Sequence, residues 1–424
     1  MVTFVSMIKS LLVAFMLIML GTNVIAQNTF SISGVVKDKK DGLPGASIYL
    51  SGYKIATVAD NDGKFKLANL KPGSYDLLVQ LVGYLPYSKS VIISDKSVQV
   101  ELILKENVAQ LDEVVIRADP NRQKYINQFK EFFIGKTPNA ALCRILNPQV
   151  LNVDFDVTKS TLTVSTTEFL IVENKALGYR LKYMLDHFEY NSRTHIIYYA
   201  GHPFFEELKA SAAKKKKYIA AREVAYYGSS QHFFRSLYAN KTQEEGFIIN
   251  KMIKIPNPNR YPQYVVNANL EKIKAVPDKT GIRQTKGKVD TALLAFWTKQ
   301  QEMPKTIDKF SRAEVLTDTL VHDFNQNLKY LNYTDALLIQ YTKEKESLAY
   351  SKTGFWIFRP LDVPENEISV ANLTEGGVRF YENGGIYDSR SLLYEGFWAY
   401  EKVADMVPVD YVPLPKSNKA IVEN

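Results

Sequence analysis

Residues 33–84 decide the fold of the N-terminal part of this 424-residue chain; they read SGVVKDKKDGLPGASIYLSGYKIATVADNDGKFKLANLKPGSYDLLVQLVGY. Short runs of alternating apolar residues are separated at regular spacing by glycine, proline, asparagine and aspartate. This spacing predicts turns at residues 42–45, 60–63 and 72–73, because proline fixes one backbone angle and glycine, asparagine and aspartate tolerate left-handed geometry. The pattern is typical of a small antiparallel β-sandwich.

The strands that we expect around these turns cover residues 31–37, 46–50, 74–81 and 98–104. The last one alternates most clearly, since one of its faces carries Val98, Val100, Leu102 and Leu104. We therefore predict an all-β, transthyretin-like sandwich over residues 27–105, followed by a larger α+β region.

The sandwich resembles the carboxypeptidase-like regulatory domain, which is found beside metallocarboxypeptidases. The matching residues are Gly34, Pro44-Gly45-Ala46, Thr57, Asp60, Asp62-Gly63, Phe65, Leu70, Pro72-Gly73, Tyr75 and Gly83-Tyr84. The chain departs from the family at Ile55-Ala56, where a glycine usually precedes the threonine. The resemblance implies a module that holds or positions other parts.

Residues 1–26 have the pattern of a secretory signal peptide. Lys9 precedes an unbroken apolar run over residues 11–20, and Val24 and Ala26 occupy the small-residue positions before a cleavage site. The run is short for a bilayer span, although an uncleaved anchor is the alternative. We expect an exported chain of the cell envelope, in the periplasm or associated with the outer membrane, with no integral membrane helix in its mature form.

The charge and the residue composition limit the classes of partner that we expect. The net charge of +8 is spread along the chain apart from a run of four lysines at 214–217, which we expect on a solvated helix face or against an anionic surface. No nucleic-acid recognition motif is present. Cys143 is the only cysteine, so no internal disulfide can form, and we expect a buried, inert thiol. The partner that we expect is an envelope protein or glycan.

A linker is predicted at residues 106–120. Within it, residues 111–116 (LDEVVI) are similar to the segment that engages the energy-coupling protein in TonB-dependent outer-membrane receptors; an edge strand or plain linker is the alternative. The α+β region then covers residues 121–415, and 416–424 form a loose tail.

Four motifs of the α+β region are similar to segments of exported Gram-negative proteins that carry the same sandwich in front. They are FFIG (132–135), CRILNP (143–148), ENKALGY (173–179) and YGSSQHF (227–233). This resemblance implies no activity.

Periodicity predicts the elements of this region. We expect helices at residues 121–134, 205–227 and 393–406, strands across 151–200 with a hairpin of 179–188 and 194–199, and a strand at 263–270. Ser229 or Ser230 would cap a helix that begins near Gln231. His187 and His195 would face one another across the hairpin.

Catalytic patterns are absent from the sequence. None of the five histidines has a glutamate three residues later, which excludes the zinc motif of a metallocarboxypeptidase. There is no Gly-x-Ser-x-Gly elbow and no complete phosphate loop. Ser229 and Ser230 lie near His232 in the sequence, but a catalytic arrangement is set in space. We predict no catalytic, cofactor-binding or metal-binding residues.

Five aromatic residues are the candidate binding residues: Trp356, Phe358, Phe397, Trp398 and Tyr400. Clustered aromatic rings can form a binding surface that stacks on a sugar or contacts another protein. The alternative is that they form the core of the C-terminal part.

The sequence thus favours a non-catalytic envelope binding or assembly protein. The alternatives are an enzyme that acts on envelope glycans or peptides through residues 121–415, and an accessory of a TonB-type uptake system.

Overall fold

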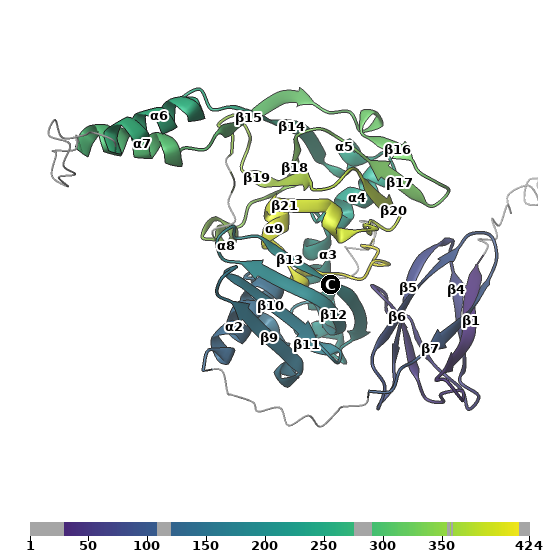
Figure 1. Ribbon diagram of the computed structural model, residues 1–424. Coiled ribbons are helices and arrows are strands. Elements are labelled where there is room, and N and C mark those ends of the chain that lie inside the picture. The colour runs from purple at the N-terminus through teal and green to yellow at the C-terminus, as the bar shows by residue number, and fades with distance from the viewer. Residues whose placement is uncertain (1–28, 108–119, 275–290, 354–356, 358, 415–424) are drawn as a thin grey trace, which may run out of the picture. The chain divides into compact units, whose positions relative to one another are not determined.

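The computed structural model describes residues 29–107, 120–274, 291–353, 357 and 359–414 (Figure 1). The chain divides into two compact units, of which the first contains strands β1–β7 and the second the elements from α2 onward. The predicted signal peptide and residues 111–116 lie outside the described residues.

The first unit is the predicted β-sandwich. One sheet has the strand order β4-β1-β7 and the other β3-β2-β5-β6. The strands are β1 (Phe30–Lys37), β2 (Ser47–Leu50), β3 (Ala56–Val58), β4 (Lys64–Leu70), β5 (Gly73–Gln80), β6 (Tyr87–Ile93) and β7 (Val98–Ile103). The predicted alternation near the end of the unit is confirmed, because Leu102 and Leu104 are buried whereas Glu101 and Ile103 are exposed.

The turn at residues 60–63 forms for the predicted reason. The Asp60 carboxylate accepts backbone N–H groups from Asp62 at 3.0 Å and Lys64 at 2.8 Å. Gly63 has φ +77°, and a Cβ atom there would lie 2.4 Å from the carbonyl oxygen of Val36. Only glycine satisfies both the backbone angle and this close approach.

The second unit begins with a six-stranded sheet of order β8-β11-β12-β10-β9, in which β13 also pairs with β12. Its elements are α2 (Arg122–Phe133), β8 (Cys143–Ile145), β9 (Leu151–Asp156), β10 (Thr161–Thr166), β11 (Leu170–Asn174), β12 (Tyr179–Asn191) and β13 (Ile197–Glu207). Helix α2 packs its buried Phe129 and Phe133 on the sheet, with the Phe129 and Phe188 ring centroids 4.9 Å apart. The aromatic stripe of this helix is therefore core.

A five-stranded sheet of order β15-β14-β18-β19-β21 and a small sheet β16-β17-β20 complete the second unit. The strands are β14 (Phe247–Pro256), β15 (Thr306–Glu314), β16 (Val321–Asp323), β17 (Leu328–Leu331), β18 (Ala336–Lys345), β19 (Asn366–Leu373), β20 (Val378–Tyr381) and β21 (Leu392–Gly396). The helices are α3 (Ala212–Tyr226), α4 (Ser230–Tyr238), α5 (Thr242–Glu245), α6 (Gln263–Lys274), α7 (Thr291–Glu302), α8 (Leu348–Ser351) and α9 (Phe397–Tyr400). Figure 1 shows α6 and α7 side by side, extending as an arm from β14 and β15.

Three predicted elements of this unit are wrong in type or extent. Residues 263–270 form helix α6 instead of a strand, since Val266 and Leu270 are buried one helical turn apart beside α7. Residues 205–207 end strand β13, so the polar helix begins only at Ala212. The predicted last helix is split into β21, the single turn α9 and a 3₁₀ turn, because β21 pairs with β19.

No helix within the described ranges is long and apolar enough to cross a membrane.

Candidate functional site

A pocket in the second unit is lined by β13, the N-terminal end of α4, and the segment from β21 to Val409. Its aromatic walls include Tyr198, Tyr199, Tyr394 and Trp398. Its polar walls include Ser229, Ser230, Gln231, Glu401, Lys402 and Asp405. The pocket therefore brings together aromatic and ionisable residues from segments that lie up to about 200 residues apart in the chain.

Trp398 forms part of the pocket wall while it is anchored in the core. Its indole Nε1 donates a hydrogen bond to the carbonyl of Gly228 at 2.8 Å, and its ring lies 5.3 Å from that of Tyr394. The tryptophan is 6% exposed. It supplies a rigid apolar surface whose polar atom is already bonded.

The other predicted binding aromatics lie elsewhere. Phe397 and Tyr400 are buried against Tyr350, with ring centroids 5.3 and 5.4 Å from it. Trp356 and Phe358 are outside the described residues. Of the five candidates, Trp398 is the one that the structure places in this pocket.

Ser229 and His232 form a helix cap. The Ser229 hydroxyl donates to the carbonyl of Tyr226 at 2.6 Å and accepts the backbone N–H of His232 at 3.2 Å, as the predicted cap of α4 requires. The His232 ring accepts from the backbone of Gly228 through Nδ1, and its Nε2 lies 3.2 Å from Glu245. Burial lowers the pKa of His232 to about 4, so the ring is neutral and serves as a structural link.

Asp405 is a buried carboxylate that joins distant parts of the second unit. It accepts hydrogen bonds from the Thr137 hydroxyl at 2.9 Å, the Asn139 amide at 3.0 Å and the backbone of Lys402 at 3.3 Å. Burial raises the pKa of Asp405 to about 6, against the opposing effect of these hydrogen bonds. Because these donors hold the carboxylate in place, its first role is structural.

Glu401 and Lys402 bring two further ionisable groups to the pocket. Burial lowers the pKa of Lys402 to about 8, and its Nζ lies 6.0 Å from the ring centroid of Tyr199. Burial, followed by repulsion from Asp405 and other carboxylates, raises the pKa of Glu401 well above its ordinary value.

The sequence analysis did not single out these charged residues. A signal was available, because Glu401, Lys402 and Asp405 interrupt an otherwise apolar run from Gly396 to Val407. Charges inside such a run are buried or functional more often than charges on a polar surface.

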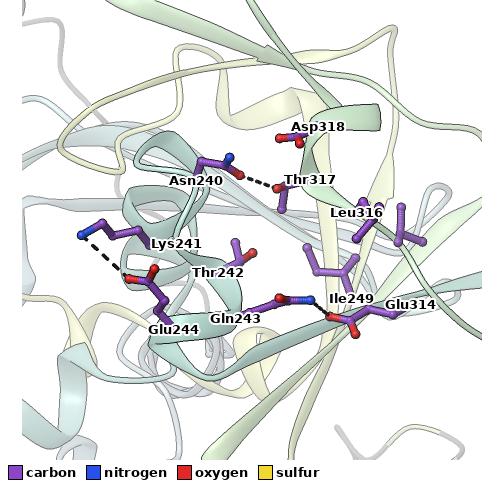
Figure 2. Close-up of a pocket in the computed structure, with 11 residues that line it drawn as sticks. Asn240, Lys241, Thr242, Gln243, Glu244, Ile249, Glu314, Leu316, Thr317 and Asp318 are labelled. Atoms are coloured by element: carbon purple, nitrogen blue, oxygen red, sulfur yellow. Dashed lines mark hydrogen bonds and ion pairs between the residues drawn. The ribbon is translucent and has the colours of Figure 1, made fainter.

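A second, smaller pocket of about 230 Å³ lies between α5, β14 and the end of β15. Figure 2 shows that its polar side chains already bind one another: Thr317 donates to Asn240 at 2.6 Å, and Gln243 donates to Glu314 at 2.8 Å. With these groups engaged and few apolar residues in its walls, this pocket is the weaker candidate.

The two histidines of the β12–β13 hairpin do not meet. His187 is opposite Ala200, whereas His195 lies in the turn at φ +58° with Nδ1 3.2 Å from the Tyr190 hydroxyl. The prediction that they face one another is wrong, because β12 continues to Asn191 and β13 begins only at Ile197, which places His195 in the turn. Within the described part of the chain, no group of three or more histidine, cysteine, aspartate or glutamate residues is arranged to hold a metal ion.

Comparison with known proteins identifies the first unit. Residues 32–116 match the family model of the CarboxypepD_reg-like domain. The TonB-dependent receptor SusC of Bacteroides thetaiotaomicron is 33% identical over 111 residues, which are 26% of this chain and 10% of SusC. The chain thus covers only a small part of that relative.

Solved structures resemble the chain only distantly. A DUF3823 family protein from Parabacteroides merdae is 12% identical, with 42% of this chain and 80% of that chain covered at a TM-score of 0.16. A putative carbohydrate binding protein from Bacteroides uniformis is 10% identical, with 34% and 52% covered, also at a TM-score of 0.16. TM-scores this low do not indicate a shared fold. The family match, in contrast, covers residues 32–116. The N-terminal unit of this chain is a CarboxypepD_reg-like domain.

Proposed function

We propose that this chain is a non-catalytic binding protein of the cell envelope and that the pocket of its second unit binds a glycan. The aromatic and polar walls of the pocket are the observation that carries the proposal. Binding sites for small ligands combine apolar and aromatic walls with a few placed polar groups. Tyrosine and tryptophan suit sugars because each offers an apolar ring face and a polar tip.

Tyr198 is the wall residue best suited to a test. Its side chain is partly exposed, its ring lies 4.9 Å from the Arg390 guanidinium, and its hydroxyl accepts from Arg390 Nε at 2.8 Å. The arginine thus contacts both the ring and the hydroxyl of this tyrosine. Replacing Tyr198 removes a wall of the pocket with little loss of core packing.

The experiment titrates the full chain with neutral oligosaccharides of envelope origin by calorimetry. Tyr198→Ala should weaken binding at least about ten-fold, since loss of one aromatic contact of about 1.4 kcal/mol has that effect. Tyr264→Ala is the matched control, because Tyr264 is 76% exposed on α6 and lies outside the pocket. Absence of binding to any oligosaccharide, or equal affinity of Tyr198→Ala and the unmodified chain, refutes the proposal.

The envelope location rests on residues 1–26 and on the similarity to a TonB-dependent receptor. Fractionation of a Gram-negative host that produces the chain with and without residues 1–26 tests it. The full chain should be recovered from the envelope and the shortened chain from the cytoplasm. Recovery of both from the cytoplasm would contradict the location.

A glycan- or peptide-cleaving enzyme is the second candidate function. It is favoured by the shifted pKa values of Glu401, Lys402 and Asp405 in one pocket, because such shifts cluster at catalytic sites. Turnover of an envelope glycan that disappears in Glu401→Gln would establish it. Binding without turnover supports the non-catalytic function.

An accessory role in a TonB-type system is the third candidate, and the SusC similarity favours it. The purified chain should then retain the energy-coupling protein in a pull-down, and deletion of residues 111–116 should abolish retention. Equal retention with and without this segment counts against the role.

A further inference from the structure

The small sheet β16-β17-β20 (Figure 1) presents one face to the core of the second unit and the other face away from it. Leu331 of β17 and Val378 of β20 are opposite one another and belong to the core. His322, Tyr330 and Arg379 are paired across the three strands and so form one row. Because successive residues of a strand point to opposite faces, this row points away from the core.

Arg379 packs on two exposed aromatic rings on this outer face. Its guanidinium carbon lies 4.1 Å from the ring centroid of Tyr387 and 5.4 Å from that of Phe324. These two side chains are 52% and 54% exposed. Among the residues that the structure describes, no acceptor forms a hydrogen bond or an ion pair with the guanidinium, although the arginine is only partly exposed.

The protein fixes the rings around this arginine. The backbone N–H of Gly377 donates to the Tyr330 hydroxyl at 2.9 Å, and any side chain at position 377 would collide with the Tyr330 ring. The backbone N–H of Tyr387 donates to the carbonyl of Arg379, also at 2.9 Å. A surface that is ordered before its ligand arrives loses less entropy on binding.

The carboxylate of Asp323 belongs to the other face of the sheet. Asp323 is paired with Lys329 of β17, and its carboxylate lies 3.9 Å from the lysine Nζ. The same Nζ lies 5.0 Å from the ring centroid of Tyr238, which packs against the core residue Phe380. Asp323 thus balances Lys329 on the inner face and leaves Arg379 as a cation on the outer face.

We propose that the Arg379 surface, formed by Phe324, Tyr330, Arg379 and Tyr387, binds an acidic polysaccharide through the carboxylate of a uronic acid unit. The planar guanidinium matches a carboxylate through two parallel N–H···O bonds. Each uronic acid unit also brings an apolar ring face, which suits the aromatic rings beside the arginine. The inference goes beyond the proposed function, because none of these four residues lines the pocket.

The test titrates the full chain by calorimetry with polygalacturonate, with its methyl ester and with poly-L-glutamate. The ester keeps the sugar backbone without the charge, and poly-L-glutamate keeps the carboxylates without the sugar. In about 0.15 M NaCl with EDTA, a Debye length of about 8 Å screens the general attraction between a polyanion and a chain of net charge +8. We expect polygalacturonate to bind at least about ten-fold more tightly than either, which is the effect of one hydrogen bond between charged groups.

Arg379→Met should bring the affinities for polygalacturonate and its ester within about two-fold of each other. Arg379→Lys should recover only part of the preference, because lysine lacks the planar fork. Phe324→Ala, at a position more than half exposed, should weaken polygalacturonate binding without unfolding the chain. Arg144→Met is the matched control, because Arg144 is exposed on β8 and lies outside this surface; it should keep the preference.

Equal binding of polygalacturonate and its ester by the unmodified chain overturns the proposal, and so does a preference that survives in Arg379→Met. Equal or tighter binding of poly-L-glutamate overturns the polysaccharide and indicates an acidic polypeptide instead. The pocket variant Tyr198→Ala should keep the preference. Loss of the preference in Tyr198→Ala but not in Arg379→Met would assign the uronate to the pocket and refute the Arg379 surface. Failure of every neutral oligosaccharide removes the pocket function and leaves this inference standing.

Discussion

Replacing Glu367 by glutamine should stabilise the second unit, and more so as the pH rises. Glu367 lies on β19 opposite Tyr341 of β18 and is 7% exposed. Its Oε2 atom has no hydrogen-bond partner among the residues that the structure describes. Burial, followed by repulsion from Glu344 and Glu346, raises the pKa of Glu367 from 4.5 to about 9.

The size of the effect follows from this pKa. The unfolded chain releases the proton above pH 4.5, whereas the folded chain keeps it up to about pH 9. The folded state binds more protons over this interval, so the free energy of unfolding falls as the pH rises through it. At about 1.4 kcal/mol per pH unit, the loss is about 3 kcal/mol at pH 7 and under about 1 kcal/mol at pH 5.

Glutamine has nearly the same shape and does not titrate, so Glu367→Gln should recover this loss. Urea unfolding at pH 5, 7 and 8 measures it, followed by tryptophan fluorescence, because Trp297, Trp356 and Trp398 all belong to the region after residue 120. Glu375→Gln, an exposed change between β19 and β20, is the control and should shift stability equally at each pH. A gain for Glu367→Gln that does not grow between pH 5 and pH 8 refutes the reasoning.

Three further predictions concern other parts of the chain. Cys143 is buried and burial raises its pKa to about 12, so a thiol reagent should label it only after unfolding; rapid labelling of the folded chain would contradict this. Arg222→Lys should lower the urea-derived stability of the second unit by about 2 kcal/mol, because lysine cannot reproduce the arginine's bonds to Leu177 and Glu207; an unchanged midpoint would count against this role. Gly34→Ala should unfold the sandwich, since a Cβ there would lie 1.9 Å from the Val100 carbonyl oxygen; hydrogen exchange should rise in the first unit only, and native protection there would disprove the clash.

The sandwich could be predicted from the sequence because the residues that determine its turns and strands lie close together in the chain. The turn at 60–63 depends on Asp60 and Gly63 within four residues, and the buried face of β7 follows from simple alternation. Each of these features can be inferred without knowledge of what packs against it.

The errors in the second unit arise where distant pairing decides the structure. Residues 263–270 contain β-branched and aromatic residues that favour a strand, yet their contact with α7 selects a helix. Residues 392–396 form β21 only because β19 lies beside them. Likewise, the pocket residues come from β13, α4 and the segment around Lys402, and no sequence window spans these.

The position of β1 in its sheet affects how the sandwich folds during synthesis. β1 lies between β4 and β7, and its parallel register joins Ile32 to Val98. The neighbouring sheet contains the sequence-adjacent pairs β2–β3 and β5–β6, which need little chain to close. During synthesis, however, one edge of β1 stays open until the last strand has emerged. A fragment that stops after β6 would therefore expose an unpaired strand edge, which can pair with another copy of the chain and cause aggregation.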